Sequence, residues 1–121
     1  MNGRRRDERL TGDLRLRQKR EFVRAYEEGR RIISRFFVAF IVENSEGPLR
    51  IGVVASRRVG GAVTRNRAKR LLREVFRKRK PTRDISADMV LVARGPIKEA
   101  SFGDVDAAYV KHLGRLLERI P

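Results

Sequence analysis

The stretch from Phe36 to Val42 is apolar at every position, and it constrains the fold of this chain more than any other feature. Successive side chains of a β-strand point to opposite faces of a sheet, so a strand here is apolar on both faces. Such a strand has to be covered on both sides. The run is far shorter than the ~20 residues that a membrane-spanning helix needs. We therefore expect a soluble α+β fold with layers on both faces of a sheet, and no membrane partner.

Local patterns indicate the other elements of the first half. A helix is expected over residues 20–28, ended by Gly29. Residues 43–48 are rich in turn formers. A second strand follows at 49–55, antiparallel to the first if the connection is a hairpin.

The second half predicts a helix, a strand and a helix. The first helix runs from about 62 to 79 and is followed by Pro81. It lies between the strand at 49–55 and a third strand at 89–93, so these two strands can pair in parallel as a strand–helix–strand unit. The last helix, roughly 101–119, has an apolar stripe of Phe102, Val105, Tyr109, Leu113 and Leu116.

Length and cysteine content limit the class of protein. A chain of 121 residues can build one modest core, so we expect a single domain over 14–121 and a flexible basic N-terminus over 1–13. The absence of cysteine excludes disulfides, thiolate metal sites and thiol catalysis. A cytoplasmic location fits this composition best.

The net charge of +15 points to a polyanionic partner. Arginine accounts for 24 of the 30 basic residues, and guanidinium groups bind phosphate bidentately and stack on bases. The charge is also concentrated, because residues 57–83 contain 12 basic residues and 1 acidic residue. This concentration favours a specific nucleic-acid docking face over a uniformly basic surface.

The helix expected from 62 to 79 divides this charge sharply between two faces. On a helical wheel its apolar residues fall within about 140°, and they are Ala68, Leu71, Leu72, Val75 and Phe76. A second sector of similar width holds Arg65, Asn66, Lys69, Arg70, Arg73 and Arg77. Arg67 and Lys78 lie on a flank. Like charges four residues apart repel, and Glu74 is the only acidic residue in this helix. An external polyanion explains such a face better than solvation does, and the apolar face is needed by the sheet rather than by a membrane.

The segment 56–77, centred on Arg65-Asn66-Arg67, closely resembles the signature of the protein subunit of bacterial ribonuclease P. The resemblance extends from about Leu14 to Leu117. It includes the early helix with Phe22 and Tyr26, the first strand, and the late strand that ends at Arg94.

The resemblance implies an α-β sandwich similar to domain 2 of ribosomal protein S5, in the order α-β-β-(β)-α-β-α. It also implies a left-handed crossover around the basic helix, an exception to the usual right-handed rule. The catalyst of this family is the partner RNA, which cleaves the 5′ leader from precursor tRNA. Mg²⁺ is held mainly by that RNA and the substrate. The protein is expected to be an RNA-binding monomer in a 1:1 complex with ribonuclease P RNA, with no catalytic or metal-binding residues of its own.

Carried onto this sequence, the resemblance assigns two sites. The catalytic RNA would be bound by Arg57, Arg58, Arg65, Asn66, Arg67, Lys69, Arg70 and Arg73. The single-stranded 5′ leader would lie in a central cleft between the basic helix and the sheet, lined by Phe22, Tyr26, Phe36, Val38 and Phe40. Aromatic stacking accepts any base, although each of these aromatic residues could equally belong to the core.

A nuclease site within the chain itself is not indicated. His112 is the only histidine, so paired-imidazole acid–base catalysis lacks its second group. We interpret Asp84 and Asp88 as solvated loop residues because no third carboxylate lies nearby. The alternatives that stay open are a ribosomal or other structured-RNA-binding protein, and a protein-only nuclease.

Overall fold

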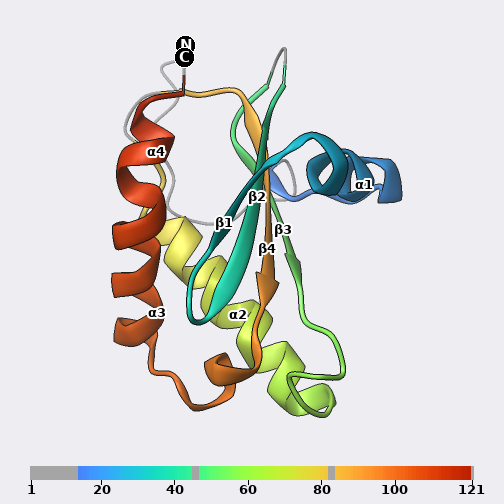
Figure 1. The fold of residues 1–121 in the computed structure, drawn as a ribbon, viewed down its shortest axis with the longest axis vertical. Coiled ribbons are helices and arrows are strands. Elements are labelled where there is room, and N and C mark those ends of the chain that lie inside the picture. The colour runs from blue at the N-terminus through green and yellow to red at the C-terminus, as the bar shows by residue number, and fades with distance from the viewer. Residues whose placement is uncertain (1–13, 45–46, 82–83, 121) are drawn as a thin grey trace.

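The computed structural model describes residues 14–44, 47–81 and 84–120, so the N-terminus 1–13 lies outside the described residues. These residues form a mixed α+β fold with a sheet between layers of helices (Figure 1). The elements follow the order α-β-β-β-α-β-α that the resemblance implies, and the strand that the residue patterns did not predict is β1. They are α1 (Lys19–Glu28), β1 (Arg30–Ile33), β2 (Phe37–Glu43), β3 (Arg50–Val54), α2 (Ala62–Lys78), β4 (Ala87–Ala93), the 3₁₀ helix η2 (Gly95–Glu99), α3 (Phe102–Tyr109), the π-helical turn η3 (Val110–Gly114) and α4 (Arg115–Glu118).

The strand order in the sheet is β1-β2-β4-β3. β4 pairs antiparallel with β2 and parallel with β3, which confirms the parallel strand–helix–strand unit. β2 and β3 run in opposite directions but do not form a hairpin, because β4 lies between them. The reason is burial: β4 is buried at all but one position, which suits a central strand rather than an edge. The left-handed sense of the crossover stays a prediction.

β2 is covered on its inner face and over part of its outer face. On the face that we call inner, Phe37, Ala39 and Ile41 pack in one core with α2 and the C-terminal helices. On the opposite face, which we call outer, Val42 packs with Ala25 of α1 in a second, smaller core. α1 and α2 therefore lie on opposite sides of the sheet.

The helices bury the stripes that their spacing predicts, with one shift. The apolar sector of α2 is confirmed, since Leu72, Val75 and Phe76 have no exposed surface. In the C-terminal segment Leu117 is buried, whereas Leu116 is only partly buried. A π-helical turn has an i→i+5 pattern and changes the phase of a helix, which accounts for the difference of one residue.

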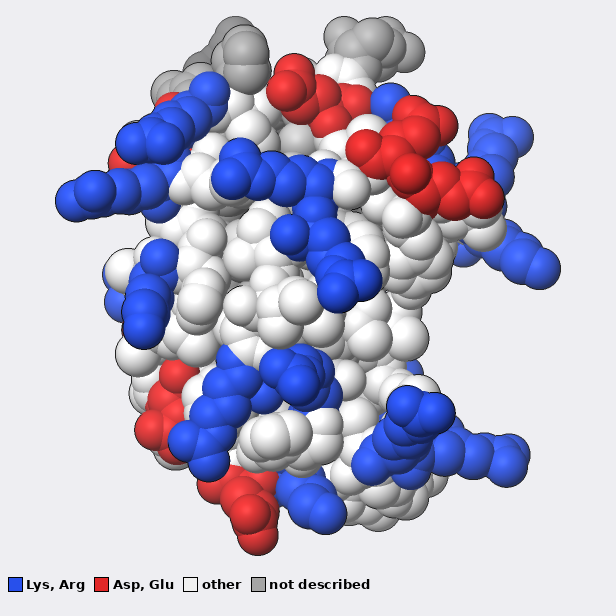
Figure 2. All heavy atoms as spheres, in the orientation of Figure 1, with Lys and Arg blue, Asp and Glu red and all other residues white. Residues whose placement is uncertain are grey.

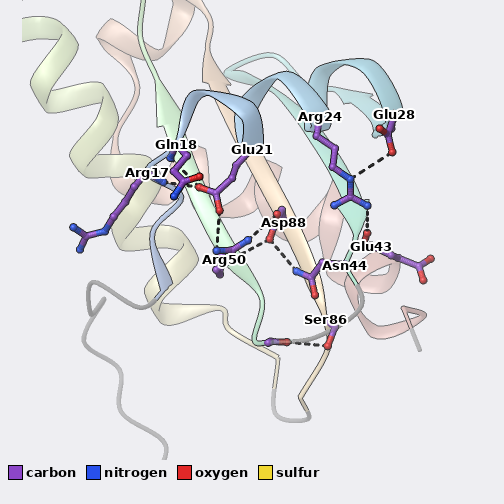
Figure 3. Close-up of polar contacts among 11 residues, drawn as sticks. Arg17, Gln18, Glu21, Arg24, Glu28, Glu43, Asn44, Arg50, Ser86 and Asp88 are labelled. Carbon is purple, nitrogen blue, oxygen red and sulfur yellow. Dashed lines mark hydrogen bonds and ion pairs between the residues drawn. The ribbon is translucent and has the colours of Figure 1, made fainter.

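Asp88 is a buried side chain of the central strand, not a solvated loop residue, so that interpretation was wrong. It is 3% exposed. Its carboxylate accepts hydrogen bonds from Arg50 Nε and Nη2, both at 3.1 Å, and from Asn44 Nδ2 at 2.9 Å (Figure 3). A buried carboxylate requires such partners, and these come from β3 and from the end of β2. Asp84, in contrast, is exposed.

Glu21 extends this polar network to α1. Its Oε2 lies 2.9 Å from Arg50 Nη1. Its Oε1 accepts hydrogen bonds from the backbone N–H groups of Arg17 and Gln18, which start the helix. The same carboxylate thus caps α1 and pairs with β3, so it fixes where the helix lies on the sheet (Figure 3).

Glu21→Gln should lower the free energy of unfolding by about 1 kcal/mol at pH 7, because a neutral amide replaces a charged acceptor. Burial alone would raise the pKa of the Glu21 carboxyl, but hydrogen bonds from Gln18, Arg17 and Arg50 and the charge of Arg50 lower it below the ordinary 4.5. A lowered carboxyl pKa adds stability above the ordinary value, and this stability is lost as the pH falls through the folded-state pKa.

The stability difference between Glu21→Gln and the parent should therefore shrink as the pH falls below about 4.5. Urea unfolding at several pH values measures it. Glu27→Gln, an exposed change in the same helix, is the control and should have little effect at any pH. A deficit for Glu21→Gln that is the same at every pH would contradict the assigned role.

Candidate nucleic-acid interface

A set of basic and amide side chains on α2 and the preceding loop has no hydrogen-bond or ion-pair partner among the described residues. Its members are Arg57, Arg58, Arg65, Asn66, Lys69, Arg70 and Arg73. We call this set the cationic face. All of the sequence-predicted RNA-binding residues belong to it except Arg67. A face of unpaired cations repels itself and is suited to a polyanion.

The cationic face is partly recessed rather than fully solvated. Arg65, Lys69 and Arg73 are half-buried, and Arg70 is exposed. The Nε of Arg65 is buried with no partner in the described structure. Burial lowers the pKa of Arg73, and the positive charge of Arg15 is a second, smaller cause in the same direction. Its guanidinium still carries its charge near neutral pH, since arginine titrates far above that range.

The amino end of α2 adds backbone donors to this face. Gly61 at the N-cap position supplies no side-chain hydrogen bond, and no acidic residue lies in the first turn. The chain enters the helix through Gly60, whose φ of +151° favours glycine. Free N–H groups and the positive end of the helix dipole therefore lie beside Arg57 and Arg58, and such an end attracts phosphate.

Arg67 and Arg77 differ from the cationic face because their side chains are engaged within the protein. Arg67 donates to the carbonyl oxygens of Ile97 and Lys98 at 3.4 Å and of Ala100 at 2.7 Å. Arg77 Nη2 lies 2.8 Å from Glu74 Oε1. Arg67 thus holds η2 against α2, a role that the position of Arg67 on the flank of the helix did not reveal.

Three aromatic side chains lie together on the outer face of the sheet. Phe22 of α1 packs over Gly52 of β3, where a Cβ atom would lie 2.5 Å from the ring. Tyr26 meets Phe40 edge-to-face, with ring centroids 5.0 Å apart. Tyr26 is 41% exposed, so this large ring is open to solvent at the edge of α1.

Beside these rings the outer face is apolar and open. The strand register aligns Ile33, Val38, Val92 and Val54 in one row across all four strands. Each is at least partly exposed, in contrast to the residues under α1. We call this row the open row. In the space-filling view an uncharged hollow lies between α1 and the basic region around the β3–α2 loop (Figure 2).

The structure corrects the position of the expected cleft. The inner face between α2 and the sheet is closed, since Ala68 and Leu72 have no exposed surface there. The hollow lies instead on the outer face, with α1 at its side. Phe22, Tyr26 and Phe40 lie together on this face, and Val38 belongs to the open row. Phe36 does not join them, because it packs against the inner core.

Sequence reasoning missed Gly52, Val54 and Val92 as parts of this site. Side chains alternate between the two faces along β3 and β4, so the sequence contains the information on which residues share a face. That information identifies the residues of the outer face only once β4 is known to pair with both β2 and β3.

No metal site is evident in residues 14–44, 47–81 and 84–120, where no group of three or more His, Cys, Asp or Glu side chains could hold an ion. His112 is half-buried on η3. Over the same ranges no helix is both long and apolar enough to cross a membrane.

Comparison with known proteins gives a consistent family. The family model described as Ribonuclease P matches residues 10–117. A ribonuclease P protein component from Desulfovibrio desulfuricans is 38% identical over 93% of this chain and 89% of its own length. One from Syntrophus aciditrophicus is 35% identical over 88% and 87%. The solved Staphylococcus aureus RNase P protein superposes with a TM-score of 0.76 at 29% identity, covering 85% of this chain and 94% of that one.

Arg67→Ala should lower the free energy of unfolding by about 1–3 kcal/mol, because it leaves carbonyl groups of η2 without their charged donor. Arg70→Ala, in the same helix but exposed and without a partner in the described structure, should change it by less than about 0.5 kcal/mol. Chemical unfolding of both variants measures the contrast. Equal stability of the two would mean that Arg67 does not hold η2.

Proposed function

Because the chain belongs to the ribonuclease P protein family, we propose that it is the RNA-binding subunit of a ribonuclease P that removes the 5′ leader from precursor tRNA. In this proposal the cationic face binds the catalytic RNA. The hollow beside the open row binds the leader. The chain acts in the cytoplasm as one copy per RNA.

The unpaired cations of α2 are the observation that carries the proposal. A cation with a structural role has a hydrogen-bond or ion-pair partner within the protein, as Arg67 and Arg77 do. The side chains of the cationic face have no such partner in the described structure. Phosphates supply the missing partners, and guanidinium groups bind them with two parallel hydrogen bonds. The recessed positions of Arg65 and Arg73 favour a shaped RNA backbone over loosely held counterions.

The outer face supports binding of a single strand. Exposed Tyr26 offers an aromatic face or edge to a base, and the open row offers apolar contact without donors that would select a sequence. Burial raises the pKa of the Tyr26 hydroxyl, so the ring stays uncharged beside leader phosphates near neutral pH. The basic β3–α2 loop on the other side of the hollow provides attraction for the strand's backbone.

The chemistry of cleavage is assigned to the partner RNA in this proposal. Mg²⁺ supplies charge neutralisation and an activated water when it is bound by RNA and substrate. The described residues contribute positioning: they neutralise phosphates and hold the leader on the outer face.

Reconstitution tests this function. The purified chain is mixed with precursor tRNA, with and without the ribonuclease P RNA encoded in the same genome, at low Mg²⁺. We expect no cleavage by the protein alone and at least tenfold faster cleavage by the RNA when the protein is added, since protein cations reduce the Mg²⁺ that the complex needs. Cleavage by the protein alone would indicate a protein-only nuclease. Failure to stimulate the RNA would favour a ribosomal or other structured-RNA binder.

Tyr26→Ala should weaken binding of the holoenzyme to precursor tRNA by about 1–2 kcal/mol, the value of one lost base stack, and leave binding of mature tRNA unchanged. Equilibrium binding of both RNAs measures the difference. Val110→Ala, an exposed apolar residue on η3, is the control and should affect neither. Equal losses for precursor and mature tRNA would remove Tyr26 from the leader site.

A further inference from the structure

A pocket of about 500 Å³ lies between the end of α2 and the C-terminal helical segment. Residues 78–81 line it from α2 and the stretch that follows, and Tyr109, Val110, Gly114, Leu117 and Glu118 line it from the C-terminal segment. The end of α2 lies beside the C-terminal helices in the fold (Figure 1). No residue of the cationic face or of the open row lines this pocket, so it is a separate surface of the protein.

Tyr109 brings a polar group without a partner to the pocket. The residue is 1% exposed, and its hydroxyl is buried with no hydrogen-bond partner in the part of the chain that the structure describes. A buried hydroxyl that makes no hydrogen bond lowers the stability of a fold. Burial raises the pKa of this hydroxyl, so it stays protonated near neutral pH and can donate to an acceptor in the pocket.

Gly114 keeps one wall of the pocket free of a side chain. Its φ of −54° and ψ of −56° are ordinary helical values that any residue adopts. A Cβ atom at this position would have Val110 Cγ1 as its listed neighbour, at 3.8 Å, which is an ordinary contact. Glycine inside a helix is less stable than alanine. Neither backbone conformation nor packing therefore requires glycine here, whereas open space in the pocket does.

The π-helical turn η3 is the third unusual feature of the pocket, and it lies between Tyr109 and Arg115. Such turns are rare and occur frequently at functional sites. An unpartnered hydroxyl, a helical glycine and a π-helical turn thus meet at one place, and each departs from what stability alone favours. Departures of this kind concentrate at functional sites.

The charges and the apolar wall indicate the class of ligand. Three of the four residues at 78–81 are basic, and Glu118 is the acidic residue of the lining. Arg79 pairs with Asp106 at 2.7 Å. Three cations against these two carboxylates leave an excess of one positive charge at the pocket. Val110 and Leu117 supply apolar surface beside it.

We propose that this pocket binds a small organic anion. Its apolar body would contact Val110 and Leu117, its negative group would face the basic residues at 78–80, and one of its oxygen atoms would accept a hydrogen bond from the Tyr109 hydroxyl. This site goes beyond the proposed function, because it uses none of the residues assigned to the catalytic RNA or to the leader.

An NMR titration of the full chain tests the site and the charge of its ligand. The probe is indole-3-acetate, and neutral indole-3-acetamide has the same ring. We expect a Kd of roughly 1 mM or lower for the acetate, with the largest amide shifts at residues 109–118, and weaker binding of the acetamide. Equal affinity of the two probes, or largest shifts on the cationic face, would overturn the proposal.

Tyr109→Phe tests the hydrogen bond without changing the size of the pocket. Affinity for indole-3-acetate should fall about fivefold, the value of one hydrogen bond. The midpoint of thermal unfolding should not fall, because the hydroxyl has no partner in the free protein. Unchanged affinity, or a lower midpoint together with weaker binding, would show a purely structural role and overturn the proposal.

Gly114→Leu tests the open space, because its side chain should fill the pocket and weaken binding of indole-3-acetate by about tenfold or more. Gly114→Ala should raise the midpoint of thermal unfolding by roughly 2–5 °C, because alanine is the better helix former. Gly103→Ala replaces an exposed helical glycine of α3 outside the pocket, and this control should keep the parent affinity. Parent-like binding by Gly114→Leu would overturn the proposal.

Discussion

The carboxylate of Asp88 is the polar group on which the arrangement of the outer face depends. It is buried on the central strand, so its charge must be compensated within the protein. Arg50 compensates it from β3 and continues to Glu21 of α1. Removing one partner of a buried ion pair destabilises a protein by far more than the intact pair stabilises it. The network therefore determines where α1 lies. It lies over one end of the sheet, and the other end keeps the open row uncovered.

The position of α1 therefore creates the candidate site. The outer face has three successive rows of side chains across β2, β4 and β3, and the network occupies the row at Val42, Asp88 and Arg50. The middle row carries Phe40 and, at Gly52, the ring of Phe22. Only the third row is left open. A single amphipathic helix, α1, thus completes one part of the core and leaves an apolar surface beside it, which is an arrangement that binding sites use.

The fold was predictable from the sequence where burial alone determines structure. The continuous apolar run from Phe36 to Val42 predicted cover on both faces, which is found along the inner face and over part of the outer face. The apolar stripe of α2 predicted its buried side, and this is confirmed. Pairings between distant segments were not predictable in this way. The sequence around Asp88 does not show that its partner is Arg50, 38 residues away, and the insertion of β4 between β2 and β3 follows from the same kind of long-range contact. The cleft was placed on the wrong face for this reason: the sequence does not show that Phe22, Tyr26 and Phe40 share the outer side of the sheet while Phe36 packs on the inner side.

Among the described residues, two groups of cations have different energetics. Arg50, Arg67 and Arg94 donate to carboxylate or carbonyl oxygens and stabilise the fold directly. The cationic face destabilises the fold, because its charged groups repel one another along α2. Packing of the core has to offset that repulsion. A ligand that binds only the folded chain stabilises it by an amount that grows with the logarithm of its concentration over Kd. RNA binding and the stability of this subunit are therefore coupled through the cationic face, and salt, which weakens both the repulsion and the attraction, should shift them in opposite directions.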